Sequence, residues 1–177
     1  MIKKLFVFDL DGVLIDSKEN MRLSWLNVCE KFKLDVSFDE YFNNIGKPFK
    51  VILTDLKIEN DQDLIQKEYN NFSIKNEEKI IFYKNVPTVL NQLVSKNILV
   101  SICTSKDSQR TERILKNLPV KFDSINCPNL NLKGKPFPDQ LIQASKVANV
   151  ELKNTIYIGD TIVDKKTAEN AGIKFIY

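Results

Sequence analysis

Outside residues 16–84, the chain alternates short apolar strands with helical patterns. The expected strands are Leu5–Phe8, Ile98–Cys103, Phe122–Asn126, Thr155–Ile158 and Ile173–Tyr177. The expected helices between the later strands are Thr88–Lys96, Ser108–Asn117, Pro138–Val147 and Ile162–Asn170. Such alternation predicts parallel βαβ units, and continuous apolar strands indicate a sheet covered on both faces. The sequence therefore predicts an α/β fold with a Rossmann-like three-layer core and a parallel five-stranded sheet.

Residues 16–84 interrupt this alternation, because their apolar residues recur only at helical spacing. One such stripe begins at Met21 and Trp25. Stripes of this kind usually pack against one another. We therefore expect two parts, an α/β core made of residues 1–15 and 85–177 and a small helical cap made of residues 16–84.

Composition excludes several kinds of protein. The chain has 177 residues, of which 43% are apolar and 28% charged, enough for an ordinary globular core. Histidine is absent, which excludes Ser-His-Asp and Cys-His catalysis and histidine-ligated metals. Cys29, Cys103 and Cys127 are widely spaced and form no metal or disulfide pattern, which favours a reducing compartment.

Charge and hydropathy narrow the range of partners. The net charge of +3 is too small to indicate nucleic acid or a membrane surface, and no apolar stretch approaches a membrane span. Only four apolar residues separate Lys4 from Asp9, too few for the core of a targeting segment. We therefore expect a cytoplasmic protein, a monomer or homodimer, without nucleic-acid or membrane partners.

Four carboxylates follow two of the expected strands. Asp9 and Asp11 come directly after the first strand, and Asp160 and Asp164 come after the fourth. Because the carboxyl ends of parallel strands meet at one edge, we expect these groups to lie together. Two like charges about 4 Å apart cost roughly 4 kcal/mol at an effective dielectric of about 20, so a cation is required. Oxygen ligands without Cys or His favour Mg²⁺.

Other strand ends supply hydroxyl and ammonium groups. Thr104 and Ser105 end the second strand, and Lys135 precedes a helix in KGKPFPD. A divalent cation and a lysine beside carboxylates suit a phosphoryl group. Each residue alone also has a structural explanation, since such residues commonly cap helices, form turns or lie in solvent. For Asp164, support of the helix from Ile162 and metal binding both remain open.

Four stretches, taken in order, resemble the motifs of the haloacid dehalogenase (HAD) superfamily. They are DLDGVLIDS, the Thr104–Ser105 strand end, KGKPFPD and GDTIVDKKTAENAG. The helical insertion resembles the cap of the phosphoglycolate phosphatase-like and β-phosphoglucomutase-like branch. The resemblance implies the sheet order fifth, fourth, first, second, third. Members usually continue past the fifth strand, so we expect Ile173–Tyr177 to be a terminal strand with less cover.

The resemblance also implies catalytic roles. Asp9 would be the nucleophile that forms an aspartyl-phosphate, and Asp11 would be the general acid and base. Lys135 would offset the charge between Asp9 and the phosphate. Thr104 would bind the phosphoryl oxygens, with help from Ser105.

The metal site and substrate follow from the same resemblance. Mg²⁺ would be bound by the Asp9 carboxylate, the Asp11 backbone carbonyl and Asp160. Asp164 would lie close by or bind through water. The implied partner is a small phosphorylated metabolite.

A stretch of the cap, Asn43–Leu53, resembles the substrate-specificity loop of that branch. Gly46 and Lys47 would then face the substrate, although a solvated loop lysine is the alternative. The cap joins the core by two connections, so we expect hinges near Asp16–Ser17 and Tyr83–Val86.

Together, these expectations predict that the protein is a Mg²⁺-dependent phosphatase. Its substrate would be a small phosphomonoester, either a sugar phosphate or a phosphoglycolate-like metabolite. Asp11 argues against a dehalogenase, which needs no acid there. A sugar-phosphate mutase of the β-phosphoglucomutase type remains an alternative, although the histidine usual in its cap is missing. A catalytically silent binding scaffold is a further alternative, which the four clustered acids oppose.

Overall fold

The core of the protein is a parallel sheet. A computed structural model describes residues 3–59 and 61–177. The sheet strands are β1 (Leu5–Phe8), β4 (Leu99–Cys103), β5 (Ser124–Asn126), β6 (Thr155–Ile158) and β7 (Lys174–Ile176). All neighbours pair in parallel, in the order β5-β4-β1-β6-β7. Counted along the chain and read from the β7 edge, this order is fifth, fourth, first, second, third, as expected.

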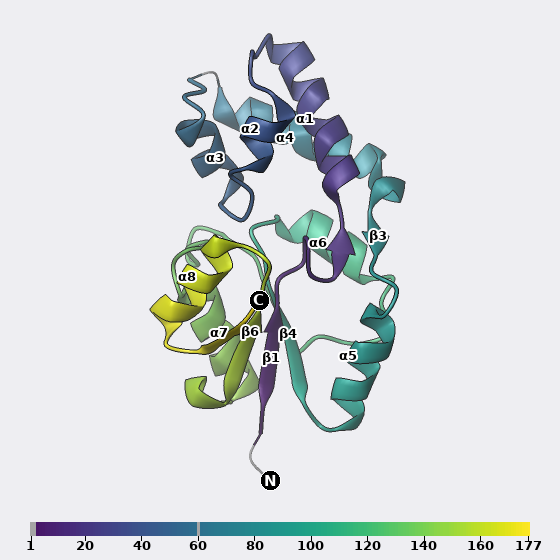
Figure 1. Cartoon of the computed structure of the whole chain (residues 1–177), viewed down its shortest axis with the longest axis vertical. Coiled ribbons are helices and arrows are strands. Elements are labelled where there is room, and N and C mark those ends of the chain that lie inside the picture. The colour runs from purple at the N-terminus through teal and green to yellow at the C-terminus, as the bar shows by residue number, and fades with distance from the viewer. Residues whose placement is uncertain (1–2, 60) are drawn as a thin grey trace.

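Helices cover both faces of this sheet (Figure 1). They are α5 (Val86–Ser95), α6 (Ser108–Leu115), α7 (Asp139–Ala148) and α8 (Ile162–Ala171). Phe8 of β1 packs in one cluster with residues of α5 and α6, whereas Val7 packs in a second cluster with α7 and α8. This division follows from the two-residue period of a strand. The predicted three-layer α/β core is confirmed.

The predicted element bounds differ from the observed ones by at most two residues. The start of α5 shows why. We expected this helix from Thr88, but it begins at Val86 with Pro87 in its first turn. Proline is tolerated there because its missing N–H group would have no partner within the helix.

A second group of helices packs above the sheet (Figure 1). It consists of α1 (Lys18–Phe32), α2 (Phe38–Phe42), α3 (Phe49–Asp55) and α4 (Gln62–Lys75), called here the α1–α4 bundle. Its apolar stripes form one cluster. The Trp25 ring stacks on Tyr41 with centroids 4.3 Å apart, and its indole N–H donates to the Val36 carbonyl at 3.0 Å. Among the described residues, no helix is both long and apolar enough to cross a membrane.

The two chain segments that join the bundle to the sheet pair with each other. They form the short antiparallel strands β2 (Ile15–Asp16) and β3 (Ile81–Phe82). We expected only helices between residues 16 and 84, and this expectation is wrong here. Strands of two residues carry no alternation in the sequence, so their pairing depends on the neighbouring chain. Two short 3₁₀ turns, Glu77–Lys79 and Leu152–Asn154, complete the described elements.

Replacing Trp25 with Ala tests the bundle core. The side chain is fully buried, so its loss should lower the free energy of unfolding by about 3–5 kcal/mol. The matched control is Leu26, which lies one position along α1 and is 45% exposed. Leu26→Ala should change the free energy of unfolding by less than about 0.5 kcal/mol. Urea unfolding followed by circular dichroism measures both. Equal effects of the two substitutions would contradict this packing.

Candidate active site

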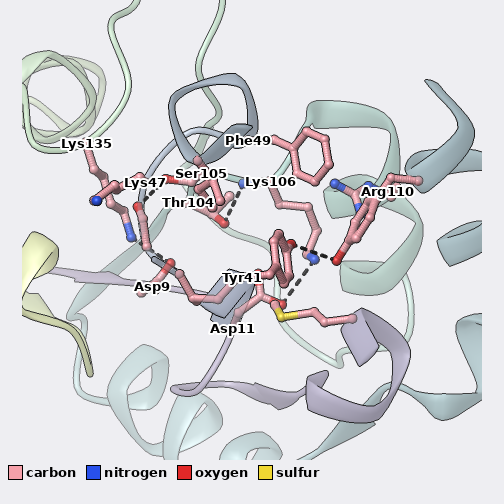
Figure 2. Close-up of a pocket in the computed structure, with 15 residues that line it drawn as sticks. Asp9, Asp11, Tyr41, Lys47, Phe49, Thr104, Ser105, Lys106, Arg110 and Lys135 are labelled. Atoms are coloured by element: carbon pink, nitrogen blue, oxygen red, sulfur yellow. Dashed lines mark hydrogen bonds and ion pairs between the residues drawn. The ribbon is translucent and has the colours of Figure 1, made fainter. Parts of the chain in front are cut away.

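A small pocket lies between the carboxyl ends of β1 and β4 and the α1–α4 bundle (Figure 2). Its volume is about 60 Å³. Every predicted catalytic and substrate-binding residue lines it, namely Asp9, Asp11, Gly46, Lys47, Thr104, Ser105 and Lys135. The structure therefore brings together residues that are more than 100 positions apart in the sequence.

Lys135 occupies the centre of the charged groups. Its side chain is fully buried, with Nζ 2.8 Å from Asp9 Oδ1 and 2.5 Å from Asp164 Oδ1. Burial alone would lower the pKa of Lys135, but the two carboxylates outweigh it and raise that pKa. Lys135 is thus a permanent cation beside Asp9, rather than a solvated lysine.

Asp9 is buried at the end of β1. Burial raises the pKa of Asp9 to about 8, Lys135 opposes this effect, and the charges of Asp164 and Asp11 add to it. A buried carboxyl favours its neutral form unless nearby positive charge stabilises the anion. Asp9 therefore needs a further cation to be ionised at neutral pH.

Asp11 lies in a different environment from Asp9 (Figure 2). Its Oδ1 accepts hydrogen bonds from the Ser17 hydroxyl at 2.5 Å and from Lys106 Nζ at 3.1 Å. Burial alone would raise the pKa of Asp11, but Lys106 and these bonds outweigh it and lower that pKa. Two carboxyl groups two residues apart thus have pKa values displaced in opposite directions, which suits them to different tasks.

Gly12 lets the chain turn close to Asp160. It has φ +81°, and a Cβ atom there would lie 2.0 Å from Asp160 Oδ2. Asp9, Asp160 and Asp164 each offer an oxygen within 4.8 Å of the others. This set of oxygens, without nitrogen or sulfur, fits a hard divalent cation such as Mg²⁺.

Asp164 has a clear structural role. Its Oδ2 accepts from the backbone N–H of Thr161, and its own backbone N–H donates to the Thr161 hydroxyl oxygen, which together form the capping box at the start of α8. The Thr161 hydroxyl also donates to Asp164 Oδ2. Its Oδ1 accepts from Lys135 and from the Tyr157 hydroxyl at 2.6 Å. Support of the helix is therefore observed, and direct metal binding by Asp164 stays a prediction.

The predicted substrate-binding residues have different partners: Ser105 and Gly46 bond to each other, whereas Lys47 pairs with an acid of the bundle. The Ser105 hydroxyl donates to the Gly46 carbonyl at 2.7 Å, a bond that joins the core to the α1–α4 bundle. Gly46 has φ +99°, and a Cβ atom on it would lie 2.9 Å from Thr161 Oγ1. Lys47 lines the pocket, but its ammonium group pairs with Asp55 at 2.7 Å.

The sequence analysis assigned no role to several pocket residues, of which Lys106 and Arg110 are charged. Lys106 directly follows Ser105, and its backbone N–H donates to the buried Thr104 hydroxyl at 3.1 Å. Arg110 lies four positions further on. Lys106 directly follows a predicted site motif, and this position is the signal that could have identified it. Arg110 lies in the first turn of α6, and its sequence position carries no comparable signal.

The sheet order, the acidic pair after β1 and the lysine beside it define the class of HAD-like hydrolases. The chain belongs to the haloacid dehalogenase-like hydrolase family, which matches residues 6–177.

Individual relatives agree with this membership. The chain is 26% identical over 183 residues to phosphoglycolate phosphatase of Aquifex aeolicus, covering 97% of this chain and 82% of that protein. It is 26% identical over 186 residues to β-phosphoglucomutase of Bacillus subtilis, covering 96% and 80%. A solved protein of Lactobacillus plantarum shares the fold, with a TM-score of 0.90 at 24% identity over 99% of this chain and 86% of that one.

Gly12→Ala should weaken Mg²⁺ binding by roughly 10–100-fold, because the new methyl group would displace the carboxylate of Asp160. Isothermal titration calorimetry measures the affinity. Gly172→Ala is the matched control, since Gly172 also has positive φ but its Cβ would meet nothing within 4 Å. A similar loss of Mg²⁺ affinity in both variants would exclude the contact as the cause.

Mg²⁺ affinity should increase with pH. Asp9 has a pKa of about 8, so its carboxyl group is mostly protonated below that pH in the metal-free protein. A cation must displace that proton, so affinity should rise between about pH 6 and about pH 8 and level off above. Calorimetry in buffers of different ionisation enthalpy detects the released proton. Asp9→Asn should release none, and a pH-independent affinity of the unmodified protein would refute the prediction.

Proposed function

We propose that this protein is a Mg²⁺-dependent phosphatase that hydrolyses a small phosphomonoester through an aspartyl-phosphate at Asp9. The observation that carries the proposal is the unequal environment of two carboxyl groups facing one pocket. Asp9 contacts Lys135, and Asp11 contacts Lys106 and Ser17. The phosphatase relative supports the same reaction. We place the protein in the cytoplasm, as a monomer or homodimer.

The residues that would hold Mg²⁺ are Asp9, Asp160 and the backbone carbonyl of Asp11, with Asp164 beside them. Bound Mg²⁺ would supply positive charge that keeps Asp9 ionised and offsets the charge of the phosphoryl oxygens. Lys135 supplies a second, fixed positive charge at 2.8 Å from Asp9. Such sites act mainly by positioning and by neutralising charge.

In the first step, an Asp9 carboxylate oxygen attacks phosphorus and the bond from phosphorus to the leaving oxygen breaks. Asp11 donates a proton to that oxygen. In the second step, a water attacks the phosphoryl group, Asp11 accepts its proton and Asp9 is released as carboxylate. The lowered pKa of Asp11 suits the second step, in which Asp11 accepts a proton. The negative charge of bound substrate would raise the pKa of Asp11, which suits the first step, in which Asp11 donates a proton.

The α1–α4 bundle would act as a cap over this site. We assign residues 16–84 to the cap and residues 1–15 and 85–177 to the core, with the paired strands β2 and β3 next to the expected hinges. Opening would break the bond from Ser105 to Gly46. Closure excludes water, which strengthens the electrostatic interactions inside the pocket.

Asparagine variants of Asp9 and Asp11 test whether the two residues have separate roles, one as nucleophile and the other as general acid and base. Asp9→Asn should abolish hydrolysis of every substrate. Asp11→Asn should slow hydrolysis of an alkyl phosphate by roughly 10²–10⁴-fold, because its alkoxide leaving group needs a proton. An aryl phosphate, whose leaving group is a weaker base, should recover part of that loss.

Release of inorganic phosphate measures these rates. Equal losses in the two variants for both leaving groups would contradict separate roles. Transfer of the phosphoryl group to a sugar, without phosphate release, would indicate a mutase. Inactivity of the unmodified protein with Mg²⁺ on all phosphomonoesters tested would favour a silent scaffold.

A further inference from the structure

We infer that Gln140 is a positioning residue for Thr104, whose hydroxyl group would bind the phosphoryl group. Gln140 lies on α7 and does not line the pocket. It would act by holding the backbone from which the Thr104 side chain projects. This inference rests on the proposed phosphatase function and adds a supporting residue to its phosphate-binding site.

The carboxamide of Gln140 bridges the ends of two neighbouring strands. Its Nε2 donates to the Thr104 carbonyl, directly after β4, at 2.9 Å and to the Asn126 carbonyl, at the end of β5, at 2.6 Å. The backbone N–H of Thr104 donates to the same Asn126 carbonyl at 3.2 Å. Thr104 lies one residue beyond the last pair of these strands, Cys103 and Asn126. The three bonds therefore fix Thr104 where the pairing of the sheet ends.

The surroundings of Gln140 determine the orientation of its carboxamide. The reverse orientation would place Oε1 against the two carbonyl oxygens, and three acceptors cannot bond to one another. In the observed orientation, Oε1 is buried and has no hydrogen-bond partner among the described residues. Burying an acceptor without a partner destabilises the folded state. An apolar side chain of similar length would avoid this penalty, so the two donated bonds explain why a carboxamide suits the position.

Asn126 extends the support to a further carbonyl of β4. Its Nδ2 donates to the Ile102 carbonyl at 2.8 Å and to the Ser124 hydroxyl at 2.9 Å. Gln140 and Asn126 are 0% and 4% exposed. Buried polar groups that bond in a network make the surrounding structure more rigid. The backbone that leads into Thr104 is therefore held from both α7 and β5.

The Thr104 side chain is oriented by a further bond at the pocket (Figure 2). Its hydroxyl oxygen accepts from the backbone N–H of Lys106 at 3.1 Å. Because that oxygen is the acceptor in this bond, the hydroxyl proton is available to a phosphoryl oxygen. Thr104 lines the same pocket as Asp9. A shift of the Thr104 backbone would move this donor relative to the nucleophile, and a misplacement of about 1 Å can slow a reaction roughly 100-fold.

Binding of inorganic phosphate tests the inference without hydrolysis. Calorimetry with Mg²⁺ compares the unmodified protein, Gln140→Met, Thr104→Val and the double variant. Met fills a similar volume without N–H donors, so Gln140→Met should weaken phosphate binding roughly 10-fold. Thr104→Val removes the hydroxyl and should weaken it roughly 10–100-fold. The double variant should bind phosphate within about twofold of Thr104→Val alone, because Gln140 acts through that hydroxyl.

Losses that multiply in the double variant would overturn the inference, because Gln140 would then act independently of the hydroxyl. Unchanged phosphate affinity in Gln140→Met would overturn it as well. If Gln140→Met does not fold, Gln140→Glu takes its place. A carboxyl group has at most one proton to donate where the carboxamide has two, so Gln140→Glu should also weaken binding, with no further effect in the Thr104→Val background.

The matched control is Ser145→Ala. Ser145 lies five positions along the same helix, is 5% exposed, and donates its hydroxyl proton to the Val150 carbonyl. The substitution removes a buried hydrogen bond of α7, so it should lower the unfolding temperature and leave phosphate affinity unchanged. Equal losses of phosphate affinity in Ser145→Ala and Gln140→Met would indicate a general loosening of α7 and overturn a specific role for Gln140.

Hydrolysis separates this inference from the proposed function. Phosphate release from an alkyl phosphate, combined with multiplying losses in the binding cycle, would overturn the role of Gln140 and leave the phosphatase standing. Binding that follows the expected cycle, without hydrolysis of any phosphomonoester, would support the role of Gln140 and overturn the phosphatase. No phosphate binding by the unmodified protein would overturn the phosphate site at Thr104 and this inference with it.

Discussion

The buried ammonium group of Lys135 holds the site together, because it pairs at once with Asp9 after β1 and with Asp164 at the start of α8. Removing one member of a buried charge cluster typically costs about 3–5 kcal/mol, since the remaining charges lose their partners. The end of the first strand, the loop before α7 and the beginning of α8 must therefore be assembled together. Thr161 and Tyr157 complete the arrangement by hydrogen bonding to Asp164. The same contacts that stabilise this edge of the sheet orient Asp9.

This arrangement also explains why the carboxyl groups of Asp9 and Asp11, only two residues apart, have different surroundings. Asp9 continues β1 and meets Lys135, whereas Gly12 turns the chain so that Asp11 meets Ser17 and Lys106 on the other side. The difference is produced by the turn and by which cation each carboxyl reaches. In the proposed reaction, Asp9 as nucleophile and Asp11 as acid would then act on one phosphoryl group without competing for the same positive charge.

The core and the acidic cluster were predictable because their signals are local. Apolar strands, helical spacing and the polar residue after each strand are visible in a few neighbouring positions, and the parallel sheet brings those positions to one edge. The pairing of β2 with β3 and the bond from Ser105 to Gly46 could not be predicted, because they depend on how distant segments approach. Lys47 and Asp55, likewise, became a pair only through the fold of the bundle. The positions of Lys106, in the turn after β4, and of Arg110, in the first turn of α6, depend on how that turn and that helix pack against the bundle.

The central claim is that Asp9 becomes covalently phosphorylated. Mixing the protein with Mg²⁺ and an activated aryl phosphate, quenching in acid within milliseconds and measuring the intact mass tests it most directly. The account predicts a fraction of the protein carrying one added phosphoryl group, located by fragmentation on Asp9 and missing in Asp9→Asn. Hydrolysis that proceeds with no phosphoprotein at any quench time, in the unmodified protein and in Asp11→Asn, would contradict it. Water would then attack phosphorus directly, with Asp9 acting only through its charge.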